Sequence, residues 1–511
     1  MNLLRAEWTK LRTMPGWVAG LLAGGLLILV FGLTPSRSGS CGQHGPGSEC
    51  VALRGPGGEE VMDSFTFVHR TLTGDGSVTV RVADLSGQLP RDDGPGMTPG
   101  LAPWAKAGLI VKDGTKQGSA YAAVMLTGEH GVRMQYDYVH DEGRDAGAKL
   151  APQPVWLRLT RAGEQVRAER SADGTTWTTA GTARLSGLPA TVTAGMFVTS
   201  PQYSTQVNES VVLSGIQGGP SSATGTFEGL ATTGSWTGDW QGTDIGAREG
   251  PAEPQPTDGT TRRAVGPRTG FEQTANGWTV TGSGDIAPGV SGASGTGVTI
   301  SQALVGTFVG LVAVVVVGAT FASGEYRRGM IRTTLAAQPR RGRVLAAKAA
   351  VLGTAVFAVG LAAAAAVVTF GQDVLRDAGA YVHPASTLTE LRVAAGTALL
   401  MAGCAVLAAG LGFLLRRGVA AVTTSIVVVV LPYLLSVTVL PLRASDWLLR
   451  VTPAAAFALQ QSEPRYAQID NVYSPADGYF PLGAWSSLAV LAVWVAAVLG
   501  GALYVLRRRD A

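Results

Sequence analysis

The sequence predicts an α-helical membrane bundle of six transmembrane helices with an all-β domain inserted after the first helix. The first observation is a division in composition: the chain from Leu304 onward is mostly Ala, Val, Leu and Gly, whereas 34–298 is rich in Gly, Thr, Ser and Pro. The second is length, because a spanning helix needs about 20 apolar residues. The qualifying segments are Trp17–Leu33, Leu304–Ala322, Ala349–Phe370, Val393–Leu415, Val419–Leu440 and Leu488–Leu506.

Basic residues set the predicted orientation, because short loops rich in Arg and Lys stay on the cytoplasmic side of a membrane. With the N-terminus inside, every inner region is basic. These regions contain Arg5, Lys10 and Arg12; the cluster from Arg327 to Lys348; Arg416 and Arg417; and Arg507, Arg508 and Arg509. Both termini are therefore predicted in the cytoplasm and the β domain outside. The net charge of +4 follows from these residues, so nucleic acid is not an expected partner.

Residues 1–16 precede the first span, and the pattern over Met1–Thr13 predicts a short amphipathic helix. Leu4, Trp8 and Leu11 recur at helical spacing, while basic side chains occupy the other side. Such a helix suits the headgroup plane of a membrane. Pro15-Gly16 then separates it from the span at 17–33, because proline breaks a continuing helix.

The first span has a second interpretation, a cleaved signal peptide, because basic residues precede its apolar core. Phe31-Gly32-Leu33-Thr34-Pro35 offers no small-x-small cleavage site. Cleavage would also leave five spans. An uncleaved anchor is therefore predicted.

The insert at 34–298 predicts an antiparallel β sandwich with its core at about 63–213. Short alternating segments are separated by turn residues, with no helical period, as is typical of this architecture. The region 214–301 is less regular, and Phe271–Val280 is expected to add a strand or two. The predicted strands are Ser77–Ala83, Ala105–Lys112, Ser119–Leu126, Gly131–Tyr138, Pro154–Arg161, Gln165–Ser171, Thr191–Thr199 and Val207–Leu213.

Cys41 and Cys50 flank a Gly-rich loop just outside the first span, where oxidation is allowed, so a disulfide is predicted. Zinc competes for the same residues with His44 as a third ligand, but a fourth ligand is lacking, and no metal site is expected. Cys404 lies among small apolar residues in the fourth span and is interpreted as a packing residue.

The loop between the second and third spans, 323–348, carries the strongest functional signal. From Glu325 to Lys348 it contains seven basic residues and one acid. The pattern predicts a short helix, Gly329 to Gln338, that ends at Pro339. A basic loop can also be a topology signal alone, but charge anchoring does not require a helix or a proline stop.

This loop resembles the cytoplasmic loop of ABC-2 type transporter permeases. The residues that carry the resemblance are Glu325-Tyr326-Arg327-Arg328-Gly329, Ile331-Arg332-Thr333-Thr334-Leu335, Pro339-Arg340-Arg341 and Ala347-Lys348. The resemblance implies that the loop contains the coupling helix that docks on an ATP-binding subunit. The basic side chains at Arg328, Arg332, Arg340 and Arg343 would then contact or orient that subunit, and Glu325 would cap or pair within the loop. Gly329, Thr333, Leu335 and Pro339 complete the expected coupling site.

The same resemblance covers about half of the chain and implies an exporter subunit in a bacterial cell membrane. Its N-terminal helix would be the elbow helix of the family, and Asp446–Gln461 falls where the family has short re-entrant helices on the outer side. The expected partners are the ABC ATP-binding subunit, the lipid bilayer and a second permease copy, identical or related. No G-x-x-x-x-G-K-[ST] motif occurs, so the chain is not expected to be an enzyme, and the partner subunit would bind ATP and Mg. The cargo stays unknown.

The inserted domain resembles concanavalin-like (laminin-G-like) jelly-roll domains over Asp63–Leu213, on Trp104–Leu109, Tyr121–Val124, Trp156–Leu159 and Ser171–Trp177. Relatives that cleave glycans usually carry an E-x-D-x-x-E motif, and none appears here, so no catalytic residue is expected. The acids Asp137, Asp141, Glu142 and Asp145 fit a solvated loop. The alternative function is a membrane-anchored carbohydrate-binding or sensing protein.

Overall fold

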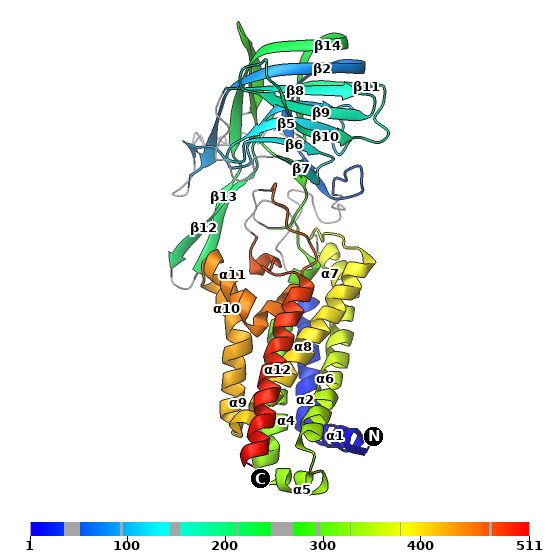
Figure 1. Ribbon diagram of the computed structural model, residues 1–511, viewed down its shortest axis with the longest axis vertical. Helices are drawn as coiled ribbons and strands as arrows, with labels where there is room; N and C mark the ends of the chain where they lie inside the picture. The colour runs from blue at the N-terminus through cyan, green and yellow to red at the C-terminus, as the bar shows by residue number, and fades with distance from the viewer. Residues whose placement is uncertain are drawn as a thin grey trace, which may run out of the picture.

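The chain folds into a β domain stacked end to end on a bundle of long helices (Figure 1). The computed structural model describes residues 2–34, 52–91, 96–143, 154–210, 213–246, 269–292, 297–327, 329–378, 380–469 and 473–509. We call the end of the bundle that faces the β domain the upper end. The opposite end, which carries α1, α5 and the C-terminus in Figure 1, is the lower end.

Six helices in the described residues are long and apolar enough to cross a membrane, as the sequence predicts. Two of them contain π-turns, one between α6 and α7 and one between α9 and α10. The bundle helices are α2 (Pro15–Gly32), α4 (Gly306–Arg327), α6 (Arg341–Ala366) with α7 (Gln372–Asp377), α8 (Thr387–Leu415), α9 (Gly418–Ser425) with α10 (Leu431–Thr438), and α12 (Ala484–Arg509).

Helix α8 forms the centre of the bundle, packed against α4, α6 and α12. Cys404 on α8 is fully buried there, in agreement with its interpretation as a packing residue. Close approach of α4 and α8 depends on Gly318, where an added Cβ would lie 2.4 Å from the carbonyl oxygen of Ala405. Small residues therefore allow the two backbones to meet, as is common between packed apolar helices.

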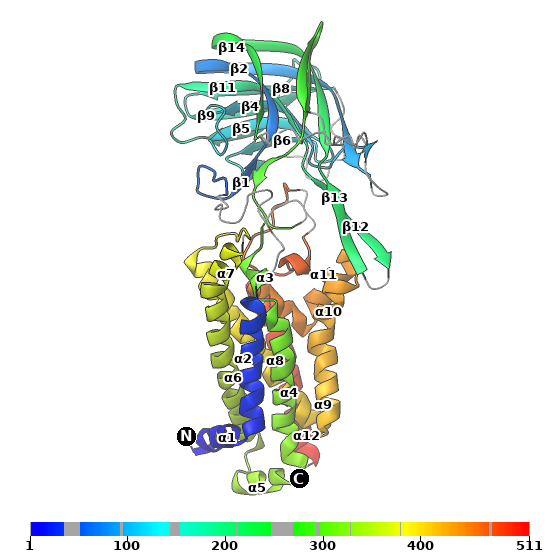
Figure 2. The same ribbon diagram turned by 180° about the vertical axis from the view of Figure 1, so that it is seen from behind.

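The N-terminal helix α1 (Asn2–Thr13) is separate from α2 and lies across the lower end of the bundle (Figure 2). Met14 is extended, and Pro15 begins α2, where a missing N–H costs nothing. Leu11 of the predicted apolar stripe is buried against the bundle, whereas Leu4 and Trp8 are about half exposed. The predicted break at Pro15 is confirmed.

Two short helices close the upper end. They are α11 (Leu442–Val451) and the 3₁₀ helix η3 (Pro453–Gln460), whose residues are all buried. The Gln460 side chain donates hydrogen bonds to the hydroxyls of Thr307 on α4, at 2.9 Å, and Thr397 on α8, at 3.1 Å. These bonds satisfy an amide that would be costly to bury alone.

The β domain is a single large antiparallel sheet that wraps around an apolar core to form a sandwich close to a barrel. Its main path runs β10-β9-β8-β2-β11-β4-β5-β6-β7, and β14 pairs with β2 and β16. The strands are β2 (Phe65–Pro90), β3 (Met97–Pro99), β4 (Lys106–Lys112), β5 (Tyr121–Thr127), β6 (Val132–Tyr136), β7 (His140–Glu142), β8 (Val155–Ala162), β9 (Gln165–Ser171), β10 (Thr178–Arg184), β11 (Thr191–Thr199), β14 (Ser222–Ile245), β15 (Gly270–Thr274) and β16 (Gly277–Gly282).

Two strands are much longer than the sequence predicts. β2 extends far beyond Ser77–Ala83, and β14 occupies a region that we expected to be irregular. The Gly74-Asp75-Gly76 stretch has the composition of a turn, but in the structure it is a bulged part of β2 opposite Gly234, which has φ 97°. β14 pairs with β2 on both sides of the bulge, so β2 continues as one strand.

The sequence predicts one strand at Val207–Leu213, but the structure has two strands in this region. They are β12 (Tyr203–Ser210) and β13 (Leu213–Gly219), which pair only with each other among the described residues. In both views this hairpin extends from the sandwich toward the upper end of the bundle (Figures 1 and 2).

A two-stranded ribbon connects the sandwich to the bundle. β1 (Val61–Asp63), which follows α2 in the chain, pairs with β17 (Ile286–Pro288), which precedes α4. Both strands are held by buried lysines from the two ends of β4: Lys106 Nζ lies 2.5 Å from Asp285, and Lys112 Nζ lies 2.8 Å from Asp63. Burial lowers the pKa of Lys112, and Asp63 opposes that shift.

These ion pairs are expected to determine the stability of the β domain. Lys106→Met leaves Asp285 buried without its cation, which should cost about 3–5 kcal/mol in urea unfolding followed by tryptophan fluorescence. The double change Lys106→Met with Asp285→Leu should recover most of that loss. Arg184→Ala, which removes an exposed ion pair to Glu164, is the control and should change little. Equal stability of the Lys106 and Arg184 variants would contradict this role.

Candidate functional site at the lower end of the bundle

The helix predicted in the loop at 323–348, between α4 and α6, is present as α5 (Met330–Ala337). Gly329 precedes it with φ 66°, a conformation that glycine adopts without strain. The amide of Gln338 closes the last turn on the carbonyl of Thr334, and Pro339 follows. In Figure 1, α5 is the lowest element of the molecule and lies beneath the ends of α4 and α6.

One face of α5 packs on the bundle and the other faces outward. Ile331 is buried, and Leu335, one turn later, packs partly against the bundle core. Most of the remaining predicted coupling residues project away from the bundle. The exposed ones are Gly329, Arg332, Thr333, Pro339, Arg340 and Arg343, and Arg328 lies outside the described residues.

A cluster of four charges, three of them buried, lies behind α5. Glu325 at the end of α4 is 2.6 Å from Lys348 of α6 and 3.1 Å from Lys10 of α1. Glu7 of α1 completes the cluster, 2.6 Å from Lys348 and 3.1 Å from Lys10. Glu7, Glu325 and Lys348 are no more than 2% exposed.

The cluster contains two carboxylates and two ammonium groups, so its total charge is zero. Each group also has a neighbour of opposite sign, which compensates the cost of burying it. Burial by itself would lower the pKa of Lys10, but the attraction of Glu325 and Glu7 outweighs it and the pKa is raised. Lys10 also donates to the hydroxyl of Thr334 on α5, at 3.4 Å. The cluster therefore joins α1, α4, α5 and α6.

Glu325 thus pairs with Lys348 inside the loop and also with α1, a connection that the sequence did not suggest. Two signals in the sequence point to the members of the cluster that the predicted site did not include. Lys348 begins a run of Ala and Val residues, where a lone charge needs a partner, and Glu7 is the one acid in a basic helix. Arg341, which belongs to the family-like stretch Pro339-Arg340-Arg341, makes a contact that the sequence did not suggest: it donates to the carbonyls of Leu506 and Arg507 at the C-terminal end of α12.

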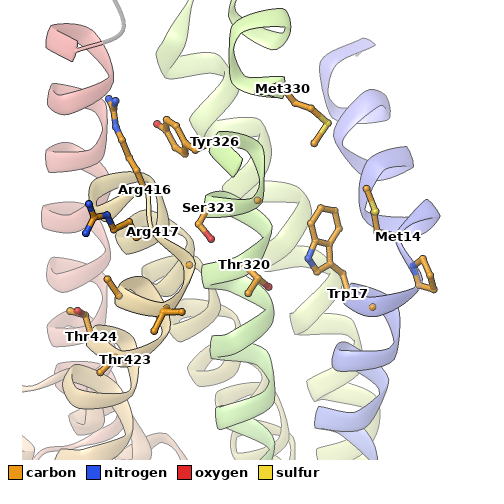
Figure 3. A pocket seen from close by; sticks show the side chains of 16 residues that line it. Met14, Trp17, Thr320, Ser323, Tyr326, Met330, Arg416, Arg417, Thr423 and Thr424 are labelled. Carbon is orange, nitrogen blue, oxygen red and sulfur yellow. The ribbon is translucent and has the colours of Figure 1, made fainter. Parts of the chain in front are cut away.

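A cleft opens beside this cluster, between the lower ends of α2, α4 and α9 (Figure 3). Its volume is about 1240 Å³. Trp17 of α2 lies on one side, Thr320 and Ser323 of α4 form the back wall, and Thr423 and Thr424 lie on α9. The cleft therefore has both apolar and hydroxyl-bearing walls.

Aromatic rings fix two corners of the cleft. The ring of Trp17 meets Phe321 edge to face at 4.9 Å. The guanidinium of Arg416 lies 5.0 Å from the centre of the Tyr326 ring, which packs edge to face against Phe413 at 6.1 Å. These contacts hold the walls in place without filling the cleft.

A second polar cluster lies at the upper end, where the sandwich meets the bundle. His383 Nδ1 is 2.5 Å from Glu60, next to β1, and 3.5 Å from Glu463. Glu463 accepts hydrogen bonds from the hydroxyls of Tyr479, at 2.6 Å, and Ser291, at 3.2 Å. The two carboxylates and the imidazole therefore connect the ribbon to loops of the bundle.

Some predictions fall outside the described residues. Cys41 and Cys50 belong to this group, so their disulfide and the competing zinc site with His44 stay predictions. Among the residues that the structure describes, no group of three His, Cys, Asp or Glu side chains is arranged to hold a metal ion.

Comparisons with known proteins give little further information. No protein-family model matches the sequence, and no curated protein matches it. Among solved structures, a functionally unknown protein from Saccharomyces cerevisiae is 16% identical, with TM-score 0.21, over 37% of this chain and 84% of that one. A mutant GH43 protein from Bacillus licheniformis is 16% identical, with TM-score 0.17, over 24% of each chain. Similarities this low support no conclusion about fold or function.

The buried cluster predicts a stability cost for any change that leaves its charges unbalanced. Lys348→Met leaves two buried carboxylates with one ammonium and should lower the melting temperature of the purified protein by several degrees, because uncompensated buried charge is costly. Arg343→Met removes an exposed positive charge from the same helix and should leave the melting temperature nearly unchanged. The same melting temperature in both variants would show that the cluster contributes little.

Proposed function

We propose that this chain is the membrane-spanning subunit of an ATP-driven ABC-2 type exporter. The observation that carries the proposal is α5, a short helix that presents exposed basic residues while a buried charge cluster ties it to three other helices. A separate subunit would bind ATP and Mg, and its surface would receive α5.

Membrane insertion is supported by the distribution of charge along the bundle. The basic residues at the ends of α4, α8 and α12, together with those of α1, all lie at the lower end. That asymmetry is expected when the lower end faces the cytoplasm. At the upper end Trp447 and Trp485 are 64% and 76% exposed, as is typical of tryptophans at a membrane–water boundary. The sandwich would then lie outside the cell.

Force applied to α5 would reach the spans through the contacts already described. Ile331 and Leu335 rest on the bundle, and Thr334 accepts from Lys10 in the charge cluster. Because Glu325 ends α4 and Lys348 lies in α6, a push on α5 would move the two helices that it connects. Transport would follow if that motion rearranges the spans around a path.

A second permease copy would cover apolar surface that the single chain leaves exposed. Leu22, Leu26 and Val30 of α2 are 52–60% exposed and lie on one helical face. Val427 and Leu434, on the fifth span, are 50% and 41% exposed. Lipid or a second copy would have to cover these faces.

Orientation can be tested by cysteine labelling in intact cells, in a background in which the native cysteines are replaced. A cysteine at Thr333 on α5 should resist a membrane-impermeant thiol reagent, and one at Thr178 in the sandwich should react. Both positions are exposed in the structure, so accessibility depends on the side of the membrane. Labelling of the Thr333 position from outside would reject the proposed orientation.

Coupling can be tested on α5 itself. Reversing charge in Arg332→Glu with Arg340→Glu should weaken co-purification of the ATP-binding subunit or separate ATP hydrolysis from export. Single surface pairs contribute only about 0–1 kcal/mol, so both changes are needed. Thr334→Pro should be more severe, because proline costs a helix about 3 kcal/mol.

The matched control reverses the same number of charges at the upper end, in Arg443→Glu with Arg450→Glu. Both arginines are exposed on α11. Membrane insertion should stay normal in every variant. Unchanged association and export in both α5 variants would reduce this loop to a topology signal.

A further inference from the structure

We infer that the cleft between α2, α4 and α9 binds an anionic phospholipid of the inner leaflet, with its phosphate at Arg416 and Arg417. The inference rests on the proposed membrane placement of the bundle and is independent of coupling to an ATP-binding subunit. Three features of the cleft carry it: its size, its charge and its height in the bundle.

The cleft is large for a small-molecule site and is bounded by helices on three sides (Figure 3). Its volume of about 1240 Å³ exceeds the roughly 300–1,000 Å³ of ordinary ligand pockets, so it can hold a headgroup and part of an acyl chain. The apolar part of the lining includes Met14, Trp17 and Met330. Unbranched thioethers and an indole suit a flexible hydrocarbon chain.

The charge of the lining favours an anion. Arg416 and Arg417 both line the cleft, and none of its 16 described lining residues is acidic. Glu325 lies between two lining residues, Gly324 and Tyr326, but its carboxylate is paired with Lys10 and Lys348 in the buried cluster. Helix α9 begins at Gly418, so its positive end adds to the field of the two arginines.

The height of the cleft matches the inner headgroup layer. It is lined by the first residues of α2 and α9, two candidate spans that begin at Pro15 and Gly418. Val419, which lines the cleft, is 83% exposed, so an acyl chain can leave the cleft beside it toward the surrounding lipid. The hydroxyl-bearing side chains of Ser323 and Thr424 also line the cleft, where a phosphate or glycerol oxygen can accept a hydrogen bond.

The test uses the purified full-length chain in nanodiscs, with phosphatidylglycerol and phosphatidylcholine of identical acyl chains as probes. Retained lipid is counted by native mass spectrometry, and affinity is measured from quenching by brominated chains. The unchanged protein should prefer phosphatidylglycerol. Arg416→Gln with Arg417→Gln should reduce that preference by roughly tenfold or more, because each arginine that contacts the lipid headgroup contributes to anionic-lipid affinity.

The control pair is Arg507→Gln with Arg508→Gln. These residues carry the same charge at the same end, and Arg508 lies 4.8 Å from the centre of the Tyr504 ring, as Arg416 lies over Tyr326, but neither lines the cleft. The control should keep the preference. A second variant, Thr423→Trp, keeps both arginines and fills the cleft from an exposed position, so it should displace the lipid without altering the fold.

An equal loss in the control pair would show attraction to the whole basic surface and would overturn the inference. Retention of phosphatidylglycerol in both cleft variants would overturn it as well. Neither result bears on the proposed function, because co-purification of an ATP-binding subunit is measured separately. Outside labelling of the Thr333 position would instead reject the membrane orientation on which the site depends.

Discussion

The buried ion cluster at the lower end is the interaction on which the rest of the bundle depends. It neutralises four charges where α1, α4 and α6 meet, and it places Glu325 and Lys348, 23 residues apart in sequence, within 2.6 Å of each other. Without it, the loop that carries α5 would be held only by its connections to the ends of α4 and α6. With it, α5 has a defined position and α1 is fixed across the bundle. Fixed geometry is what any docking partner would require.

The same device recurs where the sandwich is connected to the upper end of the bundle. Lys106 and Lys112, six residues apart on β4, point to the same face of the strand and hold Asp285 and Asp63 of the ribbon. Next to the ribbon, Glu60 contacts His383 of the bundle. Charges thus stabilise the lower end of the bundle and its connection to the sandwich, whereas the interiors of the bundle and of the sandwich are held by apolar packing.

The features that follow from local pattern were predictable from the sequence. The six apolar helices, α5 and the break at Pro15 depend on length, helical period and proline, all of which are visible in a short window. Pairing of Glu325 within its own loop was expected, but its contact with Lys10 of α1 was not predictable, because the two residues are distant in sequence and nothing local selects one for the other. The length of β2 was hidden for a related reason. Its Gly74-Asp75-Gly76 bulge has turn composition, and only the distant strand β14 makes it part of a sheet. The role of α5 and the side of the membrane stay predictions.

The pairing of β1 with β17 has a consequence for how this chain could evolve. Because β1 and β17 are paired neighbours, with Asp63 opposite Ile286, the chain leaves the sandwich beside the point at which it entered. An element whose ends are adjacent can be gained, lost or exchanged without moving the helices on either side. The sandwich is therefore modular with respect to the bundle, and α2 and α4 could be joined by a short loop in its place.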